Sequence, residues 1–141
     1  MNAKNPVKIR FVKKWPASEI VGLYRAGGWW GPSDRPSQIR EIISGSFVFA
    51  VAVDEKTRKA VGMGRVLSDG ISDAYIQDVI VSPEYRGQKL GKKIILALTD
   101  YCIKKKIGWV GLVAESGTGE FYRRLGFNVM KGHTPMKLKG V

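Results

Sequence analysis

A short basic segment with two glycines is the part of the chain best suited to chemistry. It reads Arg86-Gly87-Gln88-Lys89-Leu90-Gly91-Lys92, and it lies between a β-prone run and an apolar-periodic run that begins near Leu90. The first N–H groups of a helix have no partner within the helix, and the helix dipole makes that end positive. Glycines let a ligand come close to the backbone. We therefore predict an anion site at the start of this helix, most naturally for a phosphate or diphosphate.

A β-prone stretch precedes this segment and has to position it. The near-continuous apolar run Val79–Val81 predicts a strand that is buried on both faces. The proline that follows ends the strand, because proline has no N–H to give to a neighbouring strand. Side chains alternate along a strand, so we expect Tyr75, Gln77 and Val79 on one face and Asp78 on the other.

The remaining elements follow from the period of the apolar residues and from the glycines and prolines that interrupt it. We predict strands at Val7–Lys13, Phe47–Val53, Ala60–Leu67, Ser72–Val81, Trp109–Ala114 and Phe127–Lys131, and Pro135–Leu138 could add a last one. We predict helices that start at Ser18, at Pro36 or Ser37, at Leu90 and at Gly117, and that end near Gly27, Gly45, Lys104 and Leu125. The order β-α-α-β-β-β-α-β-α-β-(β) predicts an α/β protein with one mixed sheet, helices on both faces, and a single domain over residues 1–141.

The composition is that of one globular domain with an excess of positive charge. The 141 residues include 24 Lys and Arg against 12 Asp and Glu, which gives a formal net charge of +12. Such an excess attracts nucleic acid, an acidic membrane or an anionic cofactor, although many surface cations are simply solvated. Only the cations of residues 86–93 have a structural reason to converge on one ligand.

Several classes of protein are disfavoured. The only cysteine, Cys102, has no partner for an internal disulfide, and with the only histidine, His133, it cannot build a zinc site. No stretch approaches the ~20 apolar residues that span a bilayer, and the N-terminus lacks the apolar core of a secretory signal. We therefore expect a cytoplasmic protein with no membrane segment and no metal.

Two motifs of the chain resemble those of a known family. The run Arg86–Gly91 is similar to the acyl-CoA diphosphate loop of the GCN5-related N-acetyltransferases (GNAT), usually written Arg/Gln-x-x-Gly-x-Gly/Ala, except that Lys89 stands where the family usually has glycine. The run Phe121–Phe127 resembles the family signature Phe-Tyr-x-x-x-Gly-Phe, at a similar distance from the loop. The resemblance is strong from about Ala74 to Phe127. It implies a mixed sheet that is splayed between its fourth and fifth strands, with acyl-CoA in the splay.

The resemblance also implies an activity and a set of site residues. The reaction would be direct transfer of an acetyl group from acetyl-CoA to an amine in a ternary complex, with no metal. The pantetheine arm would pair with the strand backbone, an amide of Val79 or Ile80 would stabilise the thioester oxygen, and Tyr122 would protonate the departing thiolate. The cofactor-binding residues implied in this way are Val79, Ile80, Val81, Arg86, Gly87, Gln88, Lys89, Leu90, Gly91 and Lys92.

The acceptor side is less sharply marked. The resemblance places Trp29 and Trp30 in the loop that covers the acceptor site, and Tyr75 and Gln77 at strand positions that often carry a base or hold a water. Either Asp78 or Glu115 could remove the proton of the amine through water, and either could instead be a structural carboxylate. A small-molecule amine is favoured over a protein as acceptor, and a homodimer is an open possibility.

Two other functions compete with catalysis. The first is a non-catalytic sensor that binds acyl-CoA without turnover. The second, less favoured, is a basic module that binds nucleic acid; the chain has no helix-turn-helix or RNA-binding signature, and its aromatic residues are not interleaved with its lysines. Acetyl-CoA should stabilise the enzyme and the sensor alike, but only the enzyme should release free CoA with an amine.

Overall fold

A five-stranded mixed sheet forms the centre of the computed structural model, which describes residues 6–141. The strands are β1 (Val7–Phe11), β2 (Val48–Asp54), β3 (Ala60–Ser68), β4 (Asp73–Val81) and β5 (Trp109–Gly111), and they lie side by side in that order. The first four are antiparallel neighbours, and β5 runs parallel to β4. The start of the N-terminus, for which no secretory signal is predicted, lies outside the described residues.

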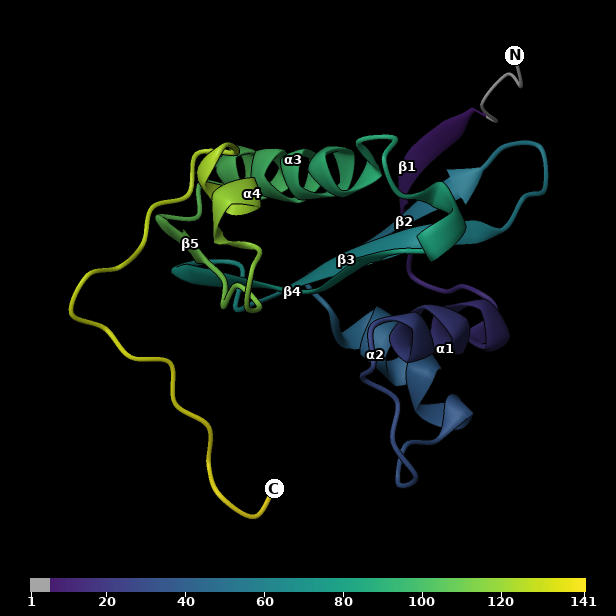
Figure 1. The fold of residues 1–141 in the computed structure, drawn as a ribbon, viewed down its shortest axis with the longest axis horizontal. Coiled ribbons are helices and arrows are strands. Elements are labelled where there is room, and N and C mark those ends of the chain that lie inside the picture. The colour runs from purple at the N-terminus through teal and green to yellow at the C-terminus, as the bar shows by residue number, and fades with distance from the viewer. Residues whose placement is uncertain (1–5) are drawn as a thin grey trace.

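Helices cover both faces of the sheet (Figure 1). One face carries α1 (Ala17–Ala26) and α2 (Ile39–Gly45), the latter preceded by the 3-10 turn η1 (Pro36–Gln38). The other face carries α3 (Leu90–Lys104), next to the short α4 (Gly119–Arg123). A second 3-10 turn, η2 (Pro83–Tyr85), joins β4 to the segment before α3. This arrangement confirms the predicted α/β architecture. No helix within residues 6–141 has the length and apolarity to cross a membrane.

Strand β2 shows why the sheet needs a layer on each side. All seven of its residues are buried, as expected for an apolar strand between two layers. Ala50 and Ala52 face the core under α3, whereas Phe49 and Val51 face the core under α1 and α2. Small residues on the α3 side bring that helix close to the sheet: a Cβ on Gly64 would lie 2.8 Å from Cγ2 of Ile94.

A bulge interrupts β4 at Asp78. Arg65 of β3 pairs with Gln77 and Met63 pairs with Ile80, so one residue of β3 opposes two of β4. Asp78 has φ 58° and points toward α1, on the same side as Gln77, whereas the next residue, Val79, packs toward α3. The prediction that Tyr75, Gln77 and Val79 share one face is therefore wrong, because the extra residue reverses the alternation. Val79–Val81 are half-buried rather than buried on both faces, since they border an opening in the sheet.

The predicted C-terminal strands do not form. Residues 127–131 and 135–138 have no strand structure, and the chain beyond α4 runs away from the sheet as an extended coil (Figure 1). Gly126 (φ 97°) and Gly132 (φ 79°) redirect the backbone on either side of residues 127–131, so this β-prone run has no neighbouring strand to pair with.

Other predicted boundaries differ from the observed ones. Strand β5 ends at Gly111 rather than Ala114, because its pairing with β4 stops there. Strand β1 ends at Phe11, and α4 is shorter than the predicted Gly117–Leu125. Helix α1 begins at Ala17, and Pro16 rather than Ser18 occupies its N-cap.

Candidate active site

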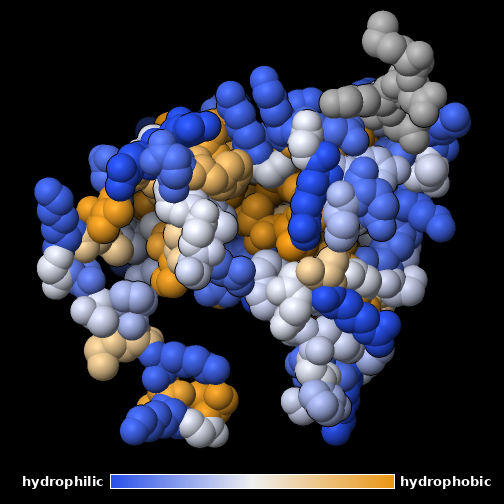
Figure 2. Space-filling model, viewed as in Figure 1, coloured by the Kyte–Doolittle hydropathy of each residue, from blue (hydrophilic) through white to orange (hydrophobic). Residues whose placement is uncertain are grey.

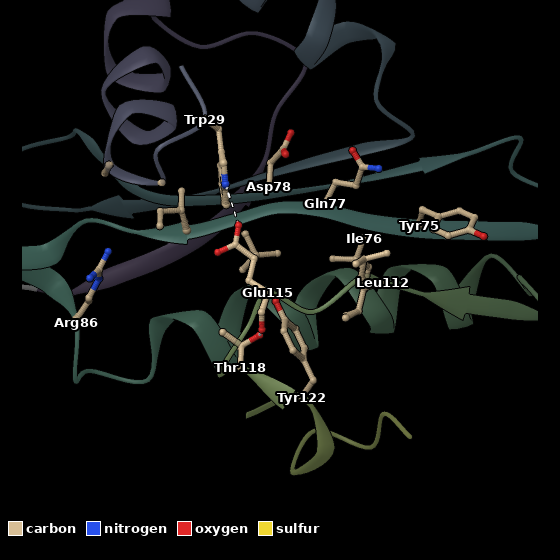
Figure 3. A pocket seen from close by; sticks show the side chains of 15 residues that line it. Trp29, Tyr75, Ile76, Gln77, Asp78, Arg86, Leu112, Glu115, Thr118 and Tyr122 are labelled. Carbon is tan, nitrogen blue, oxygen red and sulfur yellow. Dashed lines mark hydrogen bonds between the residues drawn. The ribbon is translucent and has the colours of Figure 1, made fainter. Parts of the chain in front are cut away.

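A cleft opens where β4 and β5 separate. The two strands pair only from Asp73 with Trp109 to Tyr75 with Gly111, and beyond these pairs they diverge. The cleft has a volume of about 490 Å³. Figure 3 shows its wall: residues 75–80 of β4, the end of α1 with Trp29, and the stretch from Leu112 to Tyr122.

The cleft collects many of the residues that the sequence singled out. Those that line it are Trp29, Tyr75, Gln77, Val79, Ile80, Arg86 and Tyr122. They come from positions as far apart as the end of α1 and the middle of α4, so only the fold brings them together. The ring of Tyr75 is 45% exposed and its centroid lies 5.0 Å from that of Trp109, which makes an aromatic wall at the end of the cleft away from Arg86.

A second groove, of about 700 Å³, continues from Arg86 along the start of α3. From the predicted diphosphate segment it is lined by Val81, Arg86, Gly87, Lys89, Leu90, Gly91 and Lys92, and from the α4 side by Glu120, Phe121, Arg124 and Leu125. Because Arg86 lines both spaces, the groove and the cleft meet at its side chain. Figure 2 shows hydrophobic side chains gathered in the middle of this face of the molecule, with hydrophilic ones around them.

The backbone at the start of α3 has an unusual conformation. Lys89, the N-cap residue, lies in the left-handed region with φ 60°, and Gly87 has φ 80°. A left-handed conformation costs a residue with a Cβ roughly 1–2 kcal/mol, which glycine avoids. No side chain caps the helix, so its first N–H groups are not taken up by a cap. The glycine that the resemblance implies at this position would suit this conformation, and here a lysine adopts it.

Tyr122 is held on α4 by aromatic neighbours. Its ring centroid lies 4.9 Å from that of Phe121 and 5.9 Å from that of Phe127. Burial raises the pKa of its phenol, and the negative charge of Glu115 raises it further. The hydroxyl therefore stays protonated well above neutral pH and can act as a proton donor in the cleft.

The carboxylate of Asp78 is already engaged. Its Oδ2 accepts hydrogen bonds from Nε of Arg65 at 2.6 Å and from the hydroxyl of Tyr24 at 2.8 Å. Burial raises the pKa of Tyr24, and the charge of Asp78 adds to this effect, so the phenol remains a donor. Asp78 thus links the bulge to β3 and to α1. These contacts suit a structural role for Asp78 better than a role as a catalytic base.

Glu115 and Trp29 meet across the cleft (Figure 3). The indole Nε1 of Trp29 donates a hydrogen bond to Oε1 of Glu115 at 2.9 Å. The indole lies against the backbone at the end of α1, where a Cβ on Gly27 would be 2.7 Å from its Cε3. A glycine at this position therefore lets the tryptophan lie flat and reach the opposite wall.

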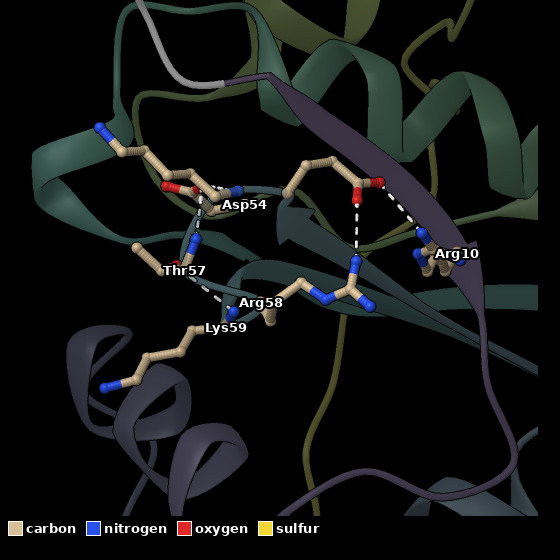
Figure 4. A network of polar contacts seen from close by, with 7 residues as sticks. Arg10, Asp54, Thr57, Arg58 and Lys59 are labelled. Atoms are coloured by element: carbon tan, nitrogen blue, oxygen red, sulfur yellow. Dashed lines mark hydrogen bonds and ion pairs between the residues drawn. The ribbon is translucent and has the colours of Figure 1, made fainter.

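A buried carboxylate holds the chain segment that leads into the second groove. Asp54, at the end of β2, is fully buried, and its Oδ1 accepts the N–H groups of Lys56 at 2.8 Å and Thr57 at 3.2 Å (Figure 4). The hydroxyl of Tyr85 donates to its Oδ2. Tyr85 directly precedes Arg86, so this contact fixes the chain where it enters the groove. No sequence pattern indicated this link.

Two predicted site residues lie elsewhere, and several lining residues were missed. Trp30 and Gln88 line neither space, and Trp30 instead packs near Tyr24, with centroids 6.2 Å apart. Among the missed residues are Leu112, Val113 and Thr118 in the cleft and Tyr85, Phe121, Arg124 and Leu125 in the groove. The spacing of Phe121, Arg124 and Leu125 places them on one face of a helix, a pattern that could have identified the last three.

The chain is similar to known acetyltransferases. A family model described as an acetyltransferase (GNAT) domain matches residues 45–129. The chain is 38% identical over 87 residues to GCN5-related N-acetyltransferase 2, chloroplastic, from Arabidopsis thaliana, covering 62% of this chain and 32% of that protein. It is 40% identical over 84 residues to histone acetyltransferase TAP1 from Glycine max, covering 60% and 35%. The chain thus spans about a third of the length of these relatives.

Solved structures share the fold over almost the whole chain. A GNAT-family acetyltransferase from Streptococcus pneumoniae superposes with a TM-score of 0.78 at 26% identity, covering 94% of this chain and 97% of the other. Glucosamine-6-phosphate N-acetyltransferase from Arabidopsis thaliana gives a TM-score of 0.75 at 23% identity, covering 95% and 99%. These similarities confirm the fold that the two sequence motifs predicted.

Proposed function

The chain belongs to the GNAT acetyltransferase family, and we propose that it transfers an acetyl group from acetyl-CoA to the amine of a small molecule. The observation that carries this proposal is the meeting, at Arg86, of a basic groove and a cleft that contains Tyr122. An anionic donor in the groove would direct its thioester into the cleft, where an amine could attack it directly in a ternary complex.

The groove suits the diphosphate of acetyl-CoA in charge and in backbone geometry. Its cations are Arg86, Lys89, Lys92 and Arg124. The uncapped start of α3 offers N–H groups and the positive end of the helix dipole. We assign the diphosphate to residues 86–92 and the pantetheine arm to the backbone of Val79–Val81, which borders both spaces. Gln88 would take part through its backbone alone.

The chemistry needs an oxyanion donor and an acid. The amine nitrogen attacks the thioester carbonyl, and the oxygen that gains charge would be stabilised by the amide of Val79 or Ile80, next to the bulge. One such donor typically lowers a barrier by about 3 kcal/mol. The C–S bond then breaks, and the thiolate would take the phenol proton of Tyr122. The proton that the nitrogen loses on forming the amide would pass to the phenolate through solvent and restore the phenol. The raised pKa of this phenol supports the assignment, because the proton stays available at neutral pH.

The decisive assay measures release of free CoA from acetyl-CoA with a panel of amines and lysine peptides. We expect release with at least one small amine, and a loss of turnover in Tyr122→Phe with little change in acetyl-CoA affinity. Tyr101→Phe is the matched control, because that ring packs against Phe11 and Phe47 outside the cleft. Binding of acetyl-CoA without CoA release would instead identify a sensor.

The binding half of the proposal has its own test. Arg86→Ala combined with Lys89→Ala should weaken acetyl-CoA binding, measured by calorimetry, more strongly at low salt than at high salt. Unchanged affinity would mean that the diphosphate lies elsewhere.

The acceptor, the cellular location and the oligomeric state of the protein are proposed less specifically. One relative is named a histone acetyltransferase, so protein lysines belong in the panel beside small amines. Another is named chloroplastic, so a plastid stands beside the cytoplasm as a location to test by fractionation. A homodimer remains a prediction that light scattering can check.

A further inference from the structure

Cations outnumber carboxylates among the residues that line the groove, and carboxylates outnumber cations among those that line the cleft. Four cations and one carboxylate line the diphosphate groove, and the carboxylate, Glu120, pairs with Arg124 at 3.4 Å. In the cleft, two carboxylates, Asp78 and Glu115, stand against the single cation Arg86. In a chain with a net charge of +12, the cleft is thus a space where lining carboxylates outnumber lining cations.

The two carboxylates of the cleft are not equivalent. Asp78 is neutralised by Arg65, which lies 2.6 Å away. Glu115 has no Lys or Arg within ion-pair distance in the described part of the chain. The one hydrogen bond that its carboxylate makes there is from Nε1 of Trp29 to Oε1, so Oε2 has no donor among residues 6–141. Glu115 thus presents an uncompensated charge with one oxygen available to a ligand.

The surroundings of Glu115 suit an organic cation. The Trp29 indole that holds the carboxylate lines the same cleft, and so does the exposed ring of Tyr75. Aromatic faces attract ammonium groups, and an aromatic wall also accepts the apolar part of an amine. The charge of Glu115 raises the pKa of Tyr122, so the two side chains are close. A cation bound at Glu115 would therefore be near Tyr122, the proposed acid.

We propose that Glu115 recognises the protonated amine of the acceptor and that Trp29 is the positioning residue that holds its carboxylate across the cleft. The ammonium donates to Oε2 while the indole N–H stays on Oε1. This inference rests on the proposed acetyltransferase function and adds to it a pair of residues that select a cationic acceptor over a neutral molecule of the same shape.

The test compares two probes, benzylamine and benzyl alcohol, binding to the full chain at pH 7. Affinities are read from shifts in ¹⁵N spectra. Benzylamine should bind about tenfold more tightly, as expected for one added hydrogen bond to a charged group. Glu115→Gln keeps the shape but removes the charge, and should bring the ratio close to one. Glu41→Gln, an exposed carboxylate of α2 outside the cleft, loses the same charge and should keep the ratio.

Trp29→Phe tests the positioning role. It removes the indole N–H, so the ratio of benzylamine affinity to benzyl alcohol affinity should fall when Trp29→Phe is made in the wild type. The same substitution should leave this ratio unchanged when it is made in Glu115→Gln. Equal affinities of the two probes for the wild type, a ratio retained in Glu115→Gln, or no saturable binding of either probe would overturn the inference.

Acetyl-CoA affinity separates this inference from the proposed function. Glu115→Gln should bind acetyl-CoA as the wild type does, and a large loss would assign Glu115 to the cofactor and overturn the inference. If the wild type released no CoA with any amine, the proposed function would fail while the preference for the cationic probe stood.

Discussion

Removal of the Tyr85 hydroxyl should lower the stability of the fold and loosen the chain segment that leads into the proposed diphosphate groove. In Tyr85→Phe the ring stays, and the variant lacks the O–H that donates to Oδ2 of Asp54. Asp54 is fully buried, so bulk water screens this interaction little. Its other side-chain oxygen keeps the N–H groups of Lys56 and Thr57. The change therefore removes a hydrogen bond to a buried carboxylate.

The size of the effect follows from that geometry. Hydrogen bonds to charged groups contribute about 1.5–3 kcal/mol. Because Oδ1 remains bonded and Tyr85 is only half-buried, water can partly replace the lost donor, so we expect the lower part of that range, about 1.5–2 kcal/mol. For a domain of this size, such a loss lowers the melting temperature by roughly 3–8 °C.

Urea unfolding followed by fluorescence gives the free energy directly, and acetyl-CoA titration of the same protein reports on the groove. Tyr101→Phe is again the control, since its hydroxyl has no hydrogen-bond partner within residues 6–141, and it should change stability by less than about 0.5 kcal/mol. If the two variants were equally stable, the link between Asp54 and Tyr85 would contribute nothing, and the reasoning would be refuted.

Two further predictions concern packing and pH. Gly64→Ala places a methyl group 2.8 Å from Cγ2 of Ile94, and overpacking should lower the free energy of unfolding by about 1–3 kcal/mol. The control Gly22→Ala, with open space around it in α1, should be neutral or stabilising in the same urea titration. A similar loss of stability in both variants would contradict the packing argument. Because burial raises the pKa of Tyr122, its phenol stays protonated to higher pH, so kcat should not decline through loss of this proton below about pH 10; a decline centred below about pH 9 that disappears in Tyr122→Phe would contradict this.

The sequence predicted best those elements whose stability is local. Helix α3 was expected from Leu90 to about Lys104 and lies there, because its buried residues recur at helical spacing. Strands β2 and β3 were placed to within a residue or so for a similar reason: apolar, β-branched runs joined by a short polar turn.

The failures came from interactions between distant parts of the chain. The bulge at Asp78 depends on Gly64 of the neighbouring strand and on Arg65 and Tyr24, none of which is adjacent to it in sequence. The run at residues 127–131 has strand propensity, but propensity without a neighbouring strand does not make a sheet. Contacts such as Trp29 with Glu115 join residues whose proximity no local pattern encodes.

Because β5 separates from β4 beyond Tyr75, part of β4 forms an unpaired sheet edge inside the protein. Beyond Tyr75, β4 has no strand beside it on the β5 side in the described chain, although its other side is paired with β3. Open edges readily recruit strands from other molecules and so favour aggregation. Here the bulge at Asp78 interrupts that edge, and the hydrogen bond between Trp29 and Glu115 crosses the cleft that the edge borders. The residues around this edge therefore have to prevent aggregation and also leave room for the proposed substrate.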